Sequence, residues 1–146
     1  MNVIDGDVVR SRLTLLQHHL TRVDARCPGT LQELVANADT RDIVAFNLEK
    51  AIQFCVDVAT HVCAAHGRSA QTAAEAFGVL SEIGLLDAEL ADKLKNAVGF
   101  RNVSVHEYAD IDWAIVFRIA SQDIGDLKSF GRAMAALISE PPPAGA

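Results

Sequence analysis

Residues 41–62 read RDIVAFNLEKAIQFCVDVATHV, and this stretch decides the fold class. Its apolar residues return every three or four positions, which is the period of an α-helix. One set repeats every seven residues: Val44, Leu48, Ala51, Cys55, Val58 and Val62. A second set lies beside it: Ile43, Ile52, Val56, Ala59 and Cys63. We therefore predict a helix, from near Thr40 to just before Gly67, that faces its own bundle core and also another surface, such as a second copy of the chain.

The same period predicts helices on both sides of this stretch. Asp7 and Asp87 are placed to cap two helix starts, and Gly67 and Gly84 to end two helices. We expect an all-α protein, an up-and-down four-helix bundle with short additional helices. The other main helices are expected over 7–26, from 87 past 98 and from about 112 past 138, with a shorter helix over 72–83 and a short helical turn at 30–36. They form one domain over 1–140, followed by a proline-rich tail at 141–146.

Composition and net charge exclude several classes of protein. The chain has 146 residues, half of them apolar and 5% aromatic, which fits one folded domain rather than a disordered chain. A net charge of −6 excludes a polybasic nucleic-acid coat held by total charge. Three cysteines without CxxC spacing exclude a disulfide framework and a four-thiolate zinc site within one chain. On a helix, His18 and His19 would point about 100° apart, and His61 and Cys63 would also face different ways, so we expect no metal. No apolar run approaches the roughly 18 residues of a membrane span, and we expect a cytoplasmic protein without a membrane.

This acidic chain has one basic window, residues 93–106, which contains Lys93, Lys95 and Arg101 and no acid. Within and just after it, residues 101–108 read RNVSVHEY. If this segment is helical, Asn102 and His106 lie one turn apart, and Arg101 and Tyr108 two turns apart. The four side chains then line one surface and could act on one ligand.

These residue types suit phosphate chemistry. Arg101 offers a planar, permanently charged set of donors, and a histidine such as His106 can exchange a proton near neutral pH. Cleavage of RNA by its own 2′-hydroxyl needs a base, an acid and positive charge, but no metal or cofactor. Because the segment has one histidine, we expect a homodimer to bring two together, with Lys93 and Lys95 following the RNA backbone. The alternative is that Arg101 and His106 are ordinary surface or capping residues.

The sequence also resembles a known family. The string R-N-x-x-x-H-x-Y at 101–108 resembles the signature of the HEPN superfamily, and its R-x4-H-x-Y form is similar to that of the HepT toxins. The similarity extends to LADKLKNAVGFRN at 90–102, to IDWAIVFRIASQDIGDLKSF at 111–130 and to the stretch at 41–62. It covers most of the chain from 41 to 137.

The resemblance implies a HEPN-type four-helix bundle that acts as a metal-independent endoribonuclease, with its active site at a homodimer interface. Arg101 would be the catalytic arginine that contacts phosphate, and His106 the catalytic histidine. Asn102 would be the polar residue that supports the motif, and Tyr108 the motif tyrosine.

The resemblance also implies a partner and a mode of control. HepT toxins are paired with an MntA-type nucleotidyltransferase antitoxin, which transfers AMP from ATP onto the motif tyrosine. The acceptor would be Tyr108, the only tyrosine in the chain. An adenylyl group there would place negative charge and bulk where RNA has to bind. Two alternatives stay open: a non-catalytic helical module that binds a nucleotidyltransferase, and a purely structural dimeric bundle.

Overall fold

The computed structural model describes residues 4–106 and 108–139, except for the side chains of residues 104–106 and 108. Within these residues the chain is helical and contains no strand, so the predicted all-α fold is confirmed. The predicted tail at 141–146 lies outside the described residues. The elements in order are α1 (Gly6–Arg26), α2 (Leu31–Ala36), α3 (Ala38–Ala65), α4 (Ala73–Glu82), α5 (Ala88–His106), the 3-10 turn η1 (Tyr108–Asp110), α6 (Trp113–Arg118), the π-helical turn η2 (Ile119–Asp123) and α7 (Ile124–Ile138).

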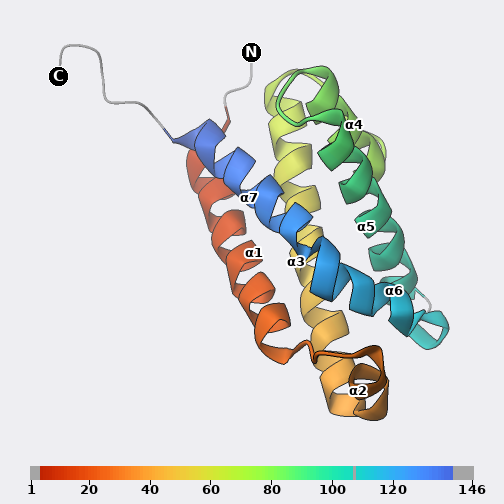
Figure 1. Ribbon diagram of the computed structural model, residues 1–146. Helices are drawn as coiled ribbons and strands as arrows, with labels where there is room; N and C mark the ends of the chain where they lie inside the picture. Colours follow the sequence, from red (N-terminus) through yellow and green to blue (C-terminus); the bar gives the residue numbers. More distant parts are fainter. Residues whose placement is uncertain (1–3, 107, 140–146) are drawn as a thin grey trace.

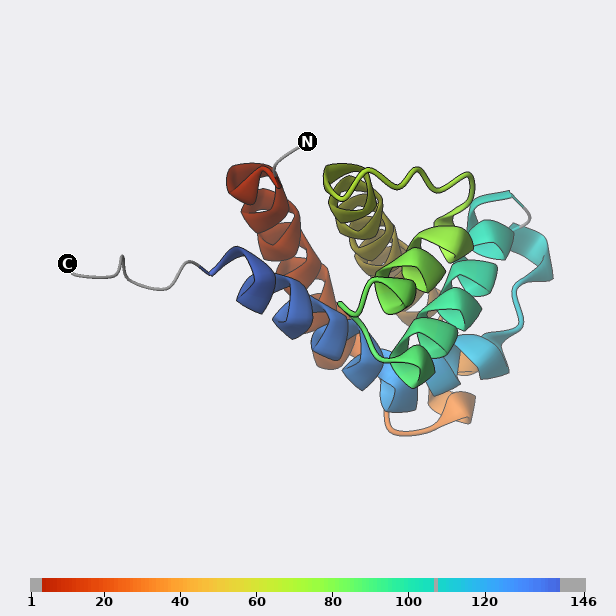
Figure 2. The same cartoon turned by 90° about the horizontal axis from the view of Figure 1, so that it is seen from above.

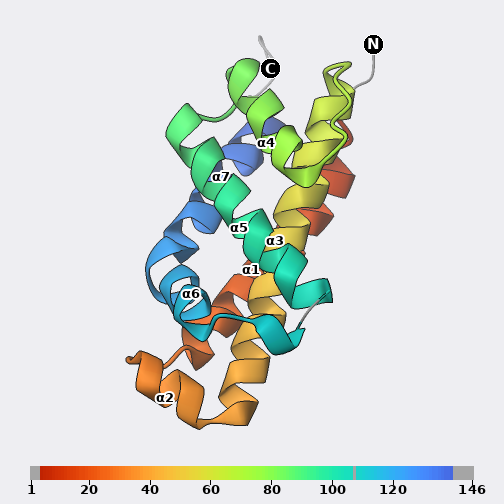
Figure 3. The same cartoon turned by 90° about the vertical axis from the view of Figure 1, so that its right-hand side faces the viewer.

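The long helix α3 is the centre of the bundle (Figures 1 and 2). α1 packs along one side of it, while α4 and α5 pack against each other and against its other side. α7 crosses this arrangement and contacts α1, α3 and α5. Viewed from the side of α4 and α5, Figure 3 shows α5 running across α3. No helix in the described part of the chain is both long enough and apolar enough to span a membrane.

Both apolar sets of α3 lie inside this single chain. In the second set, all members except Ile43 are buried: Ile52, Val56, Ala59 and Cys63. The Cys63 thiol, for example, donates a hydrogen bond of 3.4 Å to the carbonyl of Ala76 on α4. The prediction that this second set faces another surface is therefore wrong. A helix surrounded by neighbours is apolar on more than one side without any partner chain.

The helix ends follow the sequence signals with one correction. Gly67 and Gly84 have φ of 73° and 83°, the left-handed conformation that favours glycine, and they follow α3 and α4 as predicted. At the start of α1, however, the cap is Asp5, whose carboxylate accepts from the backbone N–H groups of the two residues at 7 and 8. Asp7, predicted as the cap, lies in the first turn and pairs with Arg10 at 2.7 Å.

The predicted single helix from 112 past 138 is divided by the π-helical turn η2. The Ser121 hydroxyl donates to the carbonyl of Phe117 at 2.5 Å, one turn back along the chain. Arg118 and Asp123, which are 3.3 Å apart, pair across five positions, the repeat of a π-turn. The expectation of one regular helix is therefore wrong at this turn, and α7 starts at Ile124, beside the buried core.

Candidate functional site

Helix α5 carries the start of the predicted motif. Its first turn is fixed by Asp87, which accepts from the backbone N–H of Leu90 at 2.7 Å, as predicted. The helix ends at His106, and Tyr108 begins the separate turn η1. The expectation that one helical surface extends to Tyr108 is therefore wrong, because the helix stops first. The side chains of His106 and Tyr108 lie outside the described residues.

Arg101 lies at the junction of α5 and α3. Its Nη1 donates to Oε1 of Gln53 on α3, and its Nη2 donates to Oδ1 of Asn102 at 2.6 Å. Among the described residues, its Nε has no hydrogen-bond partner although it is buried. Both acceptors are neutral amide oxygens, so these bonds orient the guanidinium without cancelling its charge. The structure therefore brings Arg101 and Asn102 together and presents a held cation at the surface.

The contacts continue from Gln53 to a third helix. The Gln53 Nε2 donates to Oδ1 of Asp57 at 2.8 Å, and Oδ2 of Asp57 lies 4.0 Å from Nε of Arg12 on α1. A line of polar side chains thus joins α1, α3 and α5. Sequence reasoning missed Gln53 and Asp57. The available signal was weak: two polar residues one helical turn apart, among several other polar residues of the stretch at 41–62.

Lys93, predicted to bind RNA, faces α7. Its Nζ lies 3.3 Å from a carboxylate oxygen of Glu89 and 3.8 Å from one of Asp126 on α7. The hydrogen bond to Glu89, followed by the charge of Asp126, raises the pKa of Lys93. Partial burial raises the pKa of Asp126, and Lys93 opposes that shift. Glu89, which precedes the basic window, and Asp126 on α7 therefore offset part of its charge.

Lys95, also predicted to bind RNA, points toward α4. Its Nζ lies 3.8 Å from Asp92, and a methyl group added at Gly78 of α4 would come within 3.3 Å of the same nitrogen. Arg101 faces α3 instead. The structure thus places Lys93, Lys95 and Arg101 on different sides of α5 and does not bring the lysines to the Arg101 junction.

The side chains that the structure describes form neither a metal site nor a reactive thiol site. No three His, Cys, Asp or Glu side chains come together there as metal ligands would. Cys27, Cys55 and Cys63 are not in disulfides. Burial, and then the charge of Asp57, raises the pKa of the Cys55 thiol far above its usual range, so this thiol stays protonated and is a poor nucleophile.

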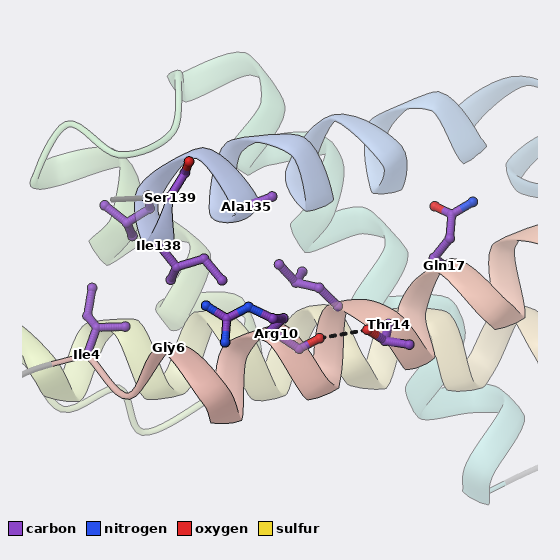
Figure 4. A pocket seen from close by; sticks show the side chains of 10 residues that line it. Ile4, Gly6, Arg10, Thr14, Gln17, Ala135, Ile138 and Ser139 are labelled. Carbon is purple, nitrogen blue, oxygen red and sulfur yellow. Dashed lines mark hydrogen bonds between the residues drawn. The ribbon is translucent and has the colours of Figure 1, made fainter. Parts of the chain in front are cut away.

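A large groove lies elsewhere, between the start of α1 and the end of α7 (Figure 4). Its volume is about 890 Å³, and it is lined by Arg10, Leu13, Ile138 and neighbouring residues, with none of the predicted site residues. Its polar groups are used locally: the Thr14 hydroxyl donates to the carbonyl of Arg10 at 3.0 Å, and the Arg10 guanidinium pairs with Asp7. Size alone therefore does not make this groove the functional site.

Comparison with known proteins identifies the family of the chain. A family model described as "Ribonuclease HepT-like" matches residues 16–134, which includes α3 and α5. The chain belongs to the HepT-like ribonuclease family. The resemblance to the HepT family is thereby confirmed, and with it the prediction of an endoribonuclease.

Two relatives in this family are named nucleases. The mRNA nuclease HepT of Shewanella oneidensis is 24% identical over 126 residues, which are 86% of this chain and 94% of that protein. The tRNA nuclease HepT of Aphanizomenon flos-aquae is 29% identical over 123 residues, 83% of each chain.

Solved structures of the HEPN fold superpose over most of the chain. The tri-AMPylated Shewanella oneidensis HEPN toxin, in complex with the MNT antitoxin, matches with a TM-score of 0.82 at 24% identity, covering 89% of this chain and 98% of that one. YutE of Bacillus subtilis, a cytosolic protein of unknown function, also has a TM-score of 0.82, at 15% identity, covering 94% and 93%. The predicted HEPN-type bundle is confirmed.

Proposed function

We propose that this HepT-like ribonuclease cleaves RNA without a metal ion, at a site formed where two copies of the chain meet. The observation that carries the proposal is Arg101, a half-buried guanidinium held by two neutral oxygens at the surface junction of α3 and α5. His106 follows five residues later on the same helix, about 7.5 Å along its axis at 1.5 Å per residue. At about 100° per residue, His106 also lies about 140° around the helix from Arg101, so we infer that the Arg101 of one copy and the His106 of the other act on the same phosphate.

The reaction is a transesterification. The 2′-oxygen of a ribose forms a bond to the adjacent phosphorus, while the bond from phosphorus to the 5′-oxygen of the next nucleotide breaks. A general base takes the proton of the 2′-hydroxyl, and a general acid gives a proton to the leaving 5′-oxygen. Arg101 binds the phosphate and stabilises its extra charge in the transition state, and Asn102 supports Arg101. The products are a 2′,3′-cyclic phosphate and a 5′-hydroxyl.

The homodimer supplies the second proton-transfer group. Each chain has one histidine in the motif, whereas the reaction needs a base and an acid. A two-fold axis close to the end of α5 brings two His106 and two Arg101 to one cleft. The exposed Val103, 40% accessible and next to Asn102, gives this end of α5 an apolar group for such a contact.

The partner that controls the enzyme is an MntA-type nucleotidyltransferase, which transfers AMP to Tyr108. The tyrosine oxygen forms a bond to the α-phosphorus of ATP, and pyrophosphate leaves. Tyr108 starts the turn directly after α5, two positions from His106, so the adenylyl phosphate is added beside the catalytic residues. The tri-AMPylated relative bound to its MNT antitoxin supports this assignment. Unpaired cysteines fit action in the cytoplasm.

The two lysines of the basic window have a supporting role. Lys93 and Lys95 lie about two turns before Arg101 on α5 and attract the RNA backbone at longer range. Their ion pairs are exposed and break easily in favour of phosphate.

Cleavage of RNA in EDTA tests the proposal. The purified chain, with Tyr108 shown to be unmodified by intact mass, is incubated with total cellular RNA beside its His106→Ala variant, and the fragment ends are analysed. We expect cleavage by the wild-type protein alone, with cyclic phosphate and 5′-hydroxyl ends. A folded, unmodified dimer that leaves RNA intact would contradict the proposal and would favour a binding module for the nucleotidyltransferase.

A further inference from the structure

We propose that Gln53 and Asp57 of α3 are positioning residues for RNA cleavage, acting through Arg101. Gln53 holds the guanidinium, and Asp57 sets the orientation of the Gln53 amide. This inference rests on the proposed function, because it assigns the parts of the fold that prepare Arg101 for phosphate. Neither residue belongs to the R-x4-H-x-Y motif, and neither is on the same helix as that motif.

Gln53 restricts a long side chain. Arg101 has several rotatable bonds, and a guanidinium at the surface would sample many positions without an acceptor beside it. The amide oxygen of Gln53 fixes Nη1 from α3, and Asn102 fixes Nη2 from α5. The buried Nε lies on the protein side of the group. Among the described residues, the Nη2 edge lies beside the exposed Asn102, and we assign this edge to the phosphate.

Asp57 determines which end of the Gln53 amide meets Arg101. An ionised carboxylate can only accept hydrogen bonds, so it selects the NH₂ group of Gln53, whose Nε2 donates to Oδ1 at 2.8 Å. The amide oxygen must then face Arg101. A reversed amide would place its NH₂ group against the guanidinium, donor against donor.

The Gln53 side chain is uncharged, and this matters for how Arg101 is presented to RNA. A carboxylate in its place would also hold Nη1, but it would form an ion pair with Arg101 and reduce the positive charge presented to RNA. An amide oxygen fixes the geometry and leaves that charge available. We therefore expect loss of the acceptor at position 53 to lower the cleavage rate. We expect a negative charge at position 53 to weaken the binding of RNA.

Single-turnover cleavage of a defined RNA by the dimer tests these roles. Gln53→Leu keeps the size of the side chain but removes the acceptor, and we expect kcat to fall about tenfold. Asp57→Asn permits both amide orientations and should lower kcat about threefold. The double variant should be no slower than Gln53→Leu, because Asp57 acts through Gln53. Gln17→Leu, a matched change of an exposed glutamine on α1, should leave kcat unchanged.

A rescue variant separates positioning from a structural role. Gln53→Glu combined with Asp57→Asn exchanges the amide and the carboxylate, so position 53 still accepts from Arg101 and still bonds to position 57, now as the acceptor, with unchanged net charge. We expect kcat within about threefold of wild type and a several-fold higher KM, because Arg101 is now paired. A folded Gln53→Leu variant with wild-type kcat would overturn the inference. Additive losses in the double variant, or a rescue variant as slow as Gln53→Leu, would also overturn it.

Failure of the proposed function is recognised separately, because wild-type protein would then not cleave the RNA at all. In that case the side-chain NMR signals of Arg101, identified by their loss in Arg101→Ala, test the positioning directly. We expect separate Nη signals in the wild type, which average in Gln53→Leu as the guanidinium rotates freely. Identical Arg101 signals in the two proteins would overturn the role of Gln53.

Discussion

Helix α3 carries two amide side chains that each reach across to a neighbouring helix, and they do different work. Asn47 is 5% exposed; its Nδ2 donates to the carbonyl of Ile43 at 2.7 Å, and its Oδ1 accepts from Nδ1 of His19 on α1 at 2.9 Å. Gln53, less than two turns later, is half-buried and accepts from the guanidinium of Arg101 on α5.

The two contacts differ in whether hydrogen-bonding groups are left without a partner. On the α1 side, both ends of the Asn47 amide are bonded within the fold, and the His19 ring stacks on Phe54 with centroids 5.7 Å apart. On the α5 side, the partner is a charged group whose Nε, among the described residues, is buried without an acceptor. A saturated contact stabilises the bundle. A contact that holds a cation with donors to spare prepares that cation for a ligand.

The largest effect should come from removing the held cation. Arg101→Ala should lower the rate of RNA cleavage by about 10²–10³-fold, because the transition-state charge loses its donor. Urea unfolding should change little, since the guanidinium is half-buried and its partners can turn to water. If Arg101→Ala instead lowered the free energy of unfolding and left the cleavage rate of the folded protein unchanged, the contact between α5 and α3 would be structural, as the Asn47 contact is.

Removing the amide that contacts α1 should lower stability and leave the cleavage rate unchanged. Asn47→Ala leaves the partly buried His19 ring nitrogen without its partner, and we expect a loss of about 1–3 kcal/mol in the free energy of unfolding. The cleavage rate of the folded fraction should stay at the wild-type level. Urea titration followed by single-turnover kinetics measures both quantities. A large fall in rate at full folding would remove the distinction between the two contacts.

A smaller effect should separate charge from geometry at the α5 contact. Arg101→Lys keeps a positive charge but lacks the planar fork that bonds Gln53 and Asn102 together. We expect cleavage about tenfold slower than wild type, an effect of about 1.4 kcal/mol on the barrier. The salt dependence of RNA binding should remain as in the wild type. Full activity in this variant would show that charge alone suffices and that the held geometry is unimportant.

The smallest effect is expected where α5 carries charge away from the Arg101 junction. Lys93→Ala removes a cation that already pairs with Glu89 and Asp126. We expect the slope of log binding constant against log salt to shrink by about 1, with a cleavage rate within about threefold of wild type. Binding of a 2′-deoxy-substituted RNA, followed by fluorescence anisotropy over a salt series, gives the slope. A loss as large as that of Arg101→Ala would place Lys93 in the site itself.

Local signals in the sequence account for much of the fold. The period of apolar residues locates the main helices, and Gly67, Gly84 and Asp87 mark ends that the structure confirms. The motif at 101–108 was sufficient to indicate the family, since its spacing lies within one short segment. These features depend on residues close together in the chain, which is where sequence patterns are informative.

The remaining features depend on contacts between distant segments. The hydrogen bond from Arg101 to Gln53 joins positions 48 apart, and no spacing rule predicts that α5 meets α3 there. The second apolar set of α3 is covered by this chain because of how many helices surround it, which its own periodicity does not reveal. The place where α5 ends, before Tyr108, and the π-turn at 119–123 also have no clear local signal.

The central claim is that two copies of the chain form one active site. A dimer that contains only one His106 tests this claim most directly. Wild-type and His106→Ala chains with different affinity tags are coexpressed, and the mixed dimer is purified and assayed on RNA in EDTA. We expect a rate at least about 100-fold below that of the wild-type dimer, because one of the two proton-transfer groups is missing. A mixed dimer that retains half of the wild-type rate would contradict the shared site, since each chain would then carry a complete one.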